Sequence, residues 1–234
     1  MGQKVNPRAF RTGVIFSWSS KWYAPMRTFA KTLQADVTIR KFLFGQLKAA
    51  GIASVEIERT MNAITIVLHA LKPGVIIGRQ GAGIEDLKKK LKIKFFGDKK
   101  IAIHMNIFEV DKPQLSSQIV ANQMIEEIEK RMPYRRVMRM AVERVQKAGA
   151  LGVKVALGGR LNGAEIAKRE KQTWGNVPLH TLRANIEYAC GTAHTMAGTI
   201  GVKVWIYKED VFQEKSDKAL SSHNRPTQMS GTRK

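Results

Sequence analysis

The order of apolar and polar residues predicts short helices and strands that alternate along the chain. In the first half, strict alternation and β-branched runs indicate strands, and apolar residues three or four apart indicate helices. The expected elements are a helix over residues 36–50, strands over 54–59 and 64–70, a helical turn that opens at Pro73, a helix over 83–92 and a strand over 101–107.

A second half begins at the boundary Asp111-Lys112-Pro113, where the proline suits the opening of a helix. Pro133 divides the helical stretch that follows, and the second of its two helices is expected over residues 134–148. Further strands are expected over 153–157, 181–188 and 202–207.

The two ends of the chain lack an apolar period. Residues 1–16 are predicted to form an irregular basic arm, of a kind that often orders only against a partner. Residues 211–234 are predicted to form a polar, disordered tail. Three bulky aromatic residues follow the arm, and we expect Trp18, Trp22 and Tyr23 to pack on the domain rather than stack on bases.

The charge balance points to a polyanionic partner. The chain has 234 residues, enough for one or two domains, and 40 Lys and Arg against 19 Asp and Glu give a formal net charge of +21. Such an excess repels itself in a folded chain unless a polyanion offsets it. Nucleic acid is favoured first and an anionic membrane surface second. The chain has no long apolar run, so we expect no membrane span.

Cysteine use and the first residues bear on the compartment. The one cysteine, Cys190, excludes an internal disulfide framework and a cysteine-rich zinc site, and we expect it to be a small buried residue. The first residues lack the apolar core of a secretory signal. These features predict an intracellular protein of the cytoplasm.

The sharpest local motif is the loop Gly78, Arg79, Gln80 and Gly81 between two predicted helices. Glycines let the backbone approach phosphate, and the N–H groups that open the next helix favour an anion. The order strand, helix, GxxG, helix, strand resembles the K-homology module, whose loop clamps single-stranded RNA. Walker and dinucleotide-binding patterns are absent. The loop therefore predicts RNA binding, with a plain connector between helices as the alternative.

Two sets of basic residues extend this prediction. A lysine run follows the loop and predicts a face that follows an RNA backbone, with a solvated helix face as the alternative. It consists of Lys88, Lys89, Lys90, Lys92 and Lys94, followed by Lys99 and Lys100.

The second set lies on the helix after Pro133, where Val137, Ala141 and Val145 share one face. An arginine ridge, formed by Arg135, Arg136 and Arg139, projects away from that face. Because arginine grips phosphate with two parallel hydrogen bonds and stacks on bases, the ridge predicts nucleic-acid binding, with a solvated surface as the alternative. Arg131, Arg144 and Lys147 are further candidate contacts.

The residue types that carry catalysis lack a suitable spacing. The histidines form no H-x-x-x-H pair, and the neighbouring carboxylates Glu85 and Asp86 point to different sides of their helix. We therefore predict no enzyme activity, catalytic residue, metal site, cofactor or small-molecule substrate.

Several stretches together resemble the family of bacterial small-subunit ribosomal protein three. The similar stretches are residues 1–7, 22–24, 75–81, 134–136, 158–167, 178–184 and 201–206, and the likeness covers roughly residues 1–210. Three positions depart from the family pattern: Asn6 replaces a usual histidine, Gln80 a frequent basic residue and Asn162 a common glycine.

The resemblance implies an α+β fold. A type II K-homology domain would span residues 17–110, and a C-terminal α+β domain with helices packed on an antiparallel sheet would span 111–210. The implied place is the head of the small ribosomal subunit, on ribosomal RNA and beside ribosomal proteins ten and fourteen. In the family, basic residues that match Arg135, Arg136 and Arg139 line the entrance for messenger RNA and help to open its structure.

Two interpretations from other classes stay open. A free-standing RNA chaperone or regulator would use the K-homology loop away from ribosomes, and would show a soluble pool of protein. A nucleic-acid enzyme would show activity when purified.

Overall fold

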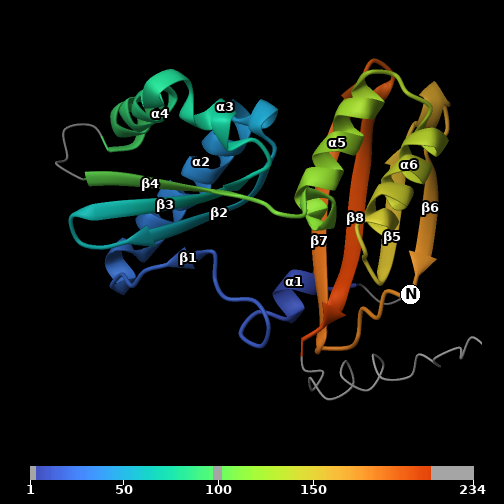
Figure 1. Cartoon of the computed structure of the whole chain (residues 1–234), viewed down its shortest axis with the longest axis horizontal. Helices are drawn as coiled ribbons and strands as arrows, with labels where there is room; N and C mark the ends of the chain where they lie inside the picture. The colour runs from blue at the N-terminus through green and yellow to red at the C-terminus, as the bar shows by residue number, and fades with distance from the viewer. Residues whose placement is uncertain (1–3, 97–101, 212–234) are drawn as a thin grey trace, which may run out of the picture.

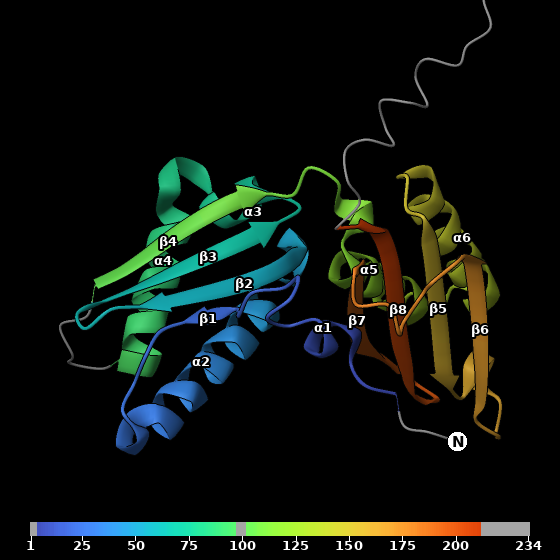
Figure 2. The same cartoon turned by 90° about the horizontal axis from the view of Figure 1, so that it is seen from below.

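The computed structural model describes residues 4–96 and 102–211. They form two bodies, each with a four-stranded sheet, which Figure 1 and Figure 2 show side by side. Lys99, Lys100 and the predicted tail beyond Val211 lie outside the described residues.

The N-terminal sheet has the order β1-β2-β3-β4. Its strands are β1 (Ser20–Lys21), β2 (Ile52–Arg59), β3 (Ala63–Ala70) and β4 (Ala102–Glu109). The β2–β3 pair is antiparallel, and the β1–β2 and β3–β4 pairs are parallel. A tight turn joins β2 to β3, and the strands expected over 54–59, 64–70 and 101–107 are confirmed within two residues at each end.

Three helices bury one face of this sheet. They are α2 (Met26–Gln46), α3 (Pro73–Ile77) and α4 (Ala82–Leu91), and a π-helical turn follows over Lys92–Phe96. Alternate residues of β3 are buried, as alternation in a strand with one covered face requires. They share a core with Ile39, Leu43, Ile76, Leu87 and Leu91 from the helices.

The prediction for the first helix was wrong at its start, because α2 begins at Met26 rather than at residue 36. The first half of α2 extends beyond the core, and the Met26 side chain is 95% exposed. The first half of α2 therefore lacks the periodic apolar residues from which a helix is predicted. The prediction that the nearby aromatic residues pack was also wrong for Trp18 and Tyr23, which are exposed.

Trp22 does pack, on a buried carboxylate that joins three elements. Asp36, fully buried in α2, accepts hydrogen bonds from Ser20 Oγ at 3.0 Å, Trp22 Nε1 at 2.7 Å and Arg59 Nε at 2.7 Å. The Trp22 ring also lies 5.3 Å from that of Phe29. Because a buried carboxylate is costly unless it is paired and hydrogen-bonded, these contacts fix β1 and β2 against α2.

The C-terminal body is a fully antiparallel sheet in the order β6-β5-β8-β7. Its strands are β5 (Gly152–Gly159), β6 (Lys168–Gly175), β7 (Ala184–Thr195) and β8 (Gly198–Asp210). Helices α5 (Ser117–Glu129) and α6 (Tyr134–Lys147) lie on one face and leave the other uncovered (Figure 2). The α+β class with helices on an antiparallel sheet is thus confirmed.

Three elements of this body, α5, β6 and β7, differ from the prediction. Pro113 opens a single 3-10 turn over Pro113–Leu115, and α5 begins only at Ser117. The edge strand β6 was not predicted, since its exposed face is polar and its inner face includes half-buried Glu170 and Gln172. The strand expected over 181–188 instead runs over Ala184–Thr195, where small residues replace β-branched ones.

Part of the arm is ordered against this chain's own C-terminal body. A short helix, α1 (Pro7–Phe10), lies against β7 (Figure 1). Arg11 follows it and is fully buried, with guanidinium hydrogen bonds to the carbonyl oxygens of Pro7 at 3.0 Å, Pro178 at 3.3 Å, Leu179 at 3.1 Å and Thr181 at 2.8 Å. Burial lowers the pKa of Arg11. The arm is thus held by neutral oxygens, with no carboxylate among the described hydrogen-bond partners of Arg11.

We predict that Arg11→Ala releases the arm. Hydrogen bonds to a charged group each contribute about 1.5–3 kcal/mol, so local opening of residues 7–16 should become easier by at least that amount. Hydrogen exchange should show faster amide exchange in the arm and around residue 180. The matched variant Arg8→Ala, which removes an exposed side chain of α1, should leave these rates nearly unchanged. Equal effects of the two variants would contradict the assignment.

Candidate nucleic-acid interface

The predicted RNA-binding loop connects α3 to α4 at the surface of the N-terminal body. Pro73 opens α3, and Gly78 ends it with a φ of +69°. Gln80 and Gly81 are also left-handed, with φ values of +53° and +82°. Arg79 and Gln80 are exposed. The backbone therefore turns with its side chains outward, directly before the N–H groups that open α4.

Close contact between the two helices depends on Gly83, which the sequence analysis did not single out. A Cβ atom on Gly83 would lie 2.5 Å from the carbonyl oxygen of Ile76, and one on Gly78 would lie 3.1 Å from the Gly83 nitrogen. Real Cβ atoms avoid such distances. Gly83, which follows Gly78 and Gly81, thus allows α3 and α4 to cross closely, and this crossing shapes the loop.

The predicted lysine face lies at the far end of α4 from the loop. Lys89, Lys90, Lys92 and Lys94 are exposed and Lys88 is half-buried. Glu85 and Asp86 stand four residues before Lys89 and Lys90, a spacing that stabilises a helix. The Lys94 ammonium lies 4.6 Å from the centre of the Phe42 ring, so it packs back on the domain. The loop and the lysines together span the length of α4, about 15 Å at 1.5 Å per residue.

The arginine ridge stands on α6 as the helical pattern predicts. Val137, Ala141 and Val145 are buried against the sheet. Arg135, Arg136 and Arg139 are exposed. Arg135 Nε donates to the Tyr134 hydroxyl at 3.2 Å, and the guanidinium lies 5.8 Å from that ring.

The position of the ridge within the helix is unusual. Two of its arginines lie in the first turn of α6, which has no acidic residue. The helix dipole makes cations unfavourable there, by about 0.3–1 kcal/mol each, and favours anions. This end of α6 therefore combines backbone N–H groups with three arginine side chains, an arrangement suited to phosphate.

The further candidate contacts differ from one another. Arg144 Nη1 lies 2.8 Å from Glu127 Oε1 in an ion pair between α6 and α5, which gives it a structural role. Arg131 is exposed in the turn before α6, with a φ of +61°, and its Nη2 lies 3.0 Å from Met196 Sδ. Lys147 is exposed in the last turn of α6.

Cys190 is exposed on β7, so the prediction that it is buried was wrong. Its strand alternates, and the neighbouring Ala189 takes the inward position. Within residues 4–96 and 102–211, no cluster of His, Cys, Asp and Glu could hold a metal ion, and no helix is long and apolar enough to cross a membrane.

Comparisons with known proteins identify the family. A model of the K-homology domain matches residues 38–115, and a model of the ribosomal protein S3 C-terminal domain matches residues 124–206. The small ribosomal subunit protein uS3 of Pelotomaculum thermopropionicum is 48% identical, over 95% of this chain and 94% of its own. The chain belongs to the uS3 family. Proteins of the same name from Lactobacillus helveticus and Laribacter hongkongensis are 47% and 46% identical, over 94% and 90% of this chain and 96% and 89% of theirs.

The three positions that are expected to depart from the family pattern differ in their local structure. The Asn6 side chain accepts a hydrogen bond from Arg8 N at 2.9 Å and caps α1. Gln80 and Asn162 both have left-handed backbones, with φ values of +53° and +55°. Asparagine tolerates that conformation better than most residues, whereas glutamine has no such advantage.

We predict that Gly83→Ala destabilises the K-homology body of this protein, because α3 and α4 must separate to admit the methyl group. The expected loss is about 1–3 kcal/mol of unfolding free energy, as for other overpacked sites. Gly74→Ala is the matched control, since a Cβ at Gly74 in α3 meets nothing within 4 Å. It should be neutral or stabilising by up to about 1 kcal/mol. Urea unfolding followed by circular dichroism compares the two, and equal stability would contradict the close helix crossing.

Proposed function

We propose that this protein is a constituent of the small ribosomal subunit in the cytoplasm. It binds ribosomal RNA in the head, contacts ribosomal proteins ten and fourteen, and lines the entrance for messenger RNA. There the arginine ridge assists the ribosome in opening messenger RNA structure. Family membership supports the subunit and the K-homology fold supports RNA binding.

The observation that carries the role at the entrance is the first turn of α6. Arg135, Arg136 and Arg139 are exposed around a helix end that already attracts anions, and no carboxylate in that turn offsets them. Because the Tyr134 hydroxyl at the start of α6 donates to Glu170 of β6, with 3.5 Å between their oxygens, the start of α6 is anchored to β6. The backbone that carries the ridge is thus held in place.

The ridge would act on RNA without catalysis. Separated strands expose phosphates and base faces, and arginine binds both. Binding the open form lowers the free energy of opening, and translocation by the ribosome supplies the work. The chain's own residues therefore need no nucleotide, acid, base or metal for this role.

The exposed loop of the K-homology body supplies a second RNA contact. Gly78 and Gly81 hold the turn, and the N–H groups at the start of α4 follow it. Arg79 places a cation beside these groups. The loop binds single-stranded RNA, and the lysines of α4 extend the positive surface along the helix.

Replacing the three ridge arginines by alanine should leave stability within about 0.5 kcal/mol per residue, since the side chains are exposed. Ribosomes that carry this variant should translate unstructured messages at the normal rate and pause more at a stable hairpin. Lysine at the same positions should restore part of the effect, because the charge returns without the planar fork. In vitro translation of paired messages with and without a hairpin measures the difference.

A matched control alters three exposed cations of α2, Arg27, Lys31 and Lys41, to alanine. This control should translate both messages normally. Equal slowing of hairpin and unstructured messages by the ridge variant would mean that the ridge serves assembly or general binding, and the opening role would be rejected.

A double change of Arg79→Asp and Gln80→Asp in the full chain should weaken RNA binding at the loop while the fold is kept. The new carboxylates repel phosphate, and aspartate tolerates the left-handed backbone at position 80. Fluorescence anisotropy with single-stranded RNA should show a loss of about tenfold or more at low salt. The control Arg27→Asp with Gln34→Asp introduces the same charges on α2. Similar losses in both variants would show that only net charge matters and that the loop is a connector.

A further inference from the structure

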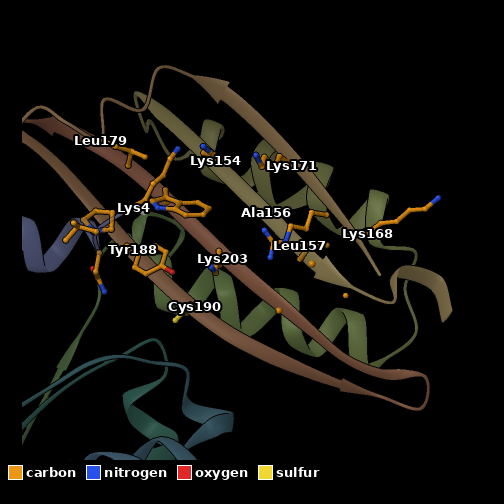
Figure 3. Close-up of a pocket in the computed structure, with 18 of the residues that line it drawn as sticks. Lys4, Lys154, Ala156, Leu157, Lys168, Lys171, Leu179, Tyr188, Cys190 and Lys203 are labelled. Carbon is orange, nitrogen blue, oxygen red and sulfur yellow. The ribbon is translucent and has the colours of Figure 1, made fainter. Parts of the chain in front are cut away.

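The uncovered face of the C-terminal sheet forms a surface separate from the loop and the ridge. It is the floor of an open depression of about 950 Å³, bordered at one end by Lys4 to Pro7 of the arm. Figure 3 shows Lys154, Lys171, Lys203, Tyr188 and Cys190 on this side of the sheet, with helices behind it. We call this surface the open sheet face.

The sheet register places these side chains in rows. Lys154 of β5 is paired with Trp205 of β8, and Trp205 is paired with Tyr188 of β7. In the next row, Lys203 is paired with Cys190. The third row contains Gly158 opposite Gly201, so the two central strands carry no side chain there. The floor at this end of the face, away from the two rings, leaves room for a ligand to lie close to the backbone.

The open sheet face carries only one sign of formal charge. Among the described residues that line it, none is Asp or Glu, and the cations are Lys4, Lys154, Lys168, Arg169, Lys171 and Lys203. They come from the arm and from β5, β6 and β8. Burial, together with the charges of Lys4 and Lys171, lowers the pKa of Lys154. A bound anion would relieve this repulsion.

Two aromatic rings stand at one end of the face. The centres of the Tyr188 and Trp205 rings are 5.3 Å apart, and both side chains are partly exposed. Lys154 Nζ lies 5.5 Å from the centre of the Trp205 ring. Bases stack on such rings in sequence-tolerant binding of single strands, while neighbouring cations contact phosphates.

We propose that the open sheet face binds single-stranded RNA, with bases stacked on Tyr188 and Trp205 and phosphates at Lys154, Lys171 and Lys203. A duplex would hide its base faces, and an acidic protein segment would satisfy the charge without a planar group for the rings. Neither the loop nor the ridge contributes a residue to the open sheet face. RNA binding at this face therefore goes beyond the proposed function and does not depend on RNA binding at the loop or the ridge.

Cys190 provides a direct probe of occupancy. It is exposed beside Lys203 and is the one cysteine of the chain. In the full-length protein, a single-stranded RNA of about ten nucleotides should slow alkylation of Cys190 by iodoacetamide about fivefold or more. The same RNA as a duplex should protect it less. The loop variant Arg79→Asp with Gln80→Asp should keep the protection, which separates failure of the loop from failure of this face.

Two sets of variants separate charge from stacking. Lys154→Gln, Lys171→Gln and Lys203→Gln together should lower affinity about tenfold or more and reduce the salt slope by about 2. The control Lys31→Gln, Lys41→Gln and Lys72→Gln removes the same charge from exposed sites of the N-terminal body and should change affinity less than about threefold. Tyr188→Leu with Trp205→Leu should lower affinity about fivefold or more with an unchanged salt slope.

Three results would overturn the proposal. The first is saturating RNA, shown by anisotropy, that leaves the alkylation rate of Cys190 unchanged. The second is an equal loss of affinity in the two triple lysine variants. The third is protection of Cys190 in assembled small subunits but not by RNA alone, which would identify a protein as the occupant.

Discussion

The distribution of carboxylates governs this structure. Only 19 acidic residues accompany 40 basic ones, so carboxylates are too few to give every cation a partner of its own. Three of the described ion pairs join elements of the fold: Asp36 with Arg59 between α2 and β2, Glu127 with Arg144 between α5 and α6, and Glu187 with Lys208 between β7 and β8. The cations of these pairs are neutralised and buried Arg11 is held by carbonyl oxygens, whereas the cations at the ridge and on the open sheet face are left to repel one another until a polyanion binds.

Sequence alone predicted the parts of the fold in which local pattern and tertiary environment agree. Alternation marked β2, β3 and β5 because one face of each strand meets helices, and the apolar stripe of α6 marked both its buried face and its exposed arginines. It failed where an element extends beyond the core, as the first half of α2 does, or lies at a sheet edge, as β6 does. In both places most side chains are exposed, so the sequence lacks the periodic apolar residues from which a helix or strand is predicted.

The candidate surfaces, too, could be predicted from the sequence only where local pattern was enough to define them. The loop and the ridge are contiguous in sequence, so their spacing could be interpreted directly. The open sheet face is assembled from the arm and from strands whose order, β6-β5-β8-β7, differs from their order in the chain. Lys154, Lys171 and Lys203 are far apart in sequence, and only strand pairing brings them together. The exposure of Cys190 and the burial of Arg11 depend likewise on where distant segments meet.

The contact of Arg11 with residues 178–181 has a consequence for the order in which a newly made chain becomes structured. The guanidinium and these three acceptors are separated by 167 to 170 residues, so the arm leaves the ribosome well before the segment on which it docks. Because bodies of a chain generally fold as they emerge, the K-homology body can form first while the basic arm stays undocked. Docking of the arm is then a late step, which can occur only after the C-terminal body has folded.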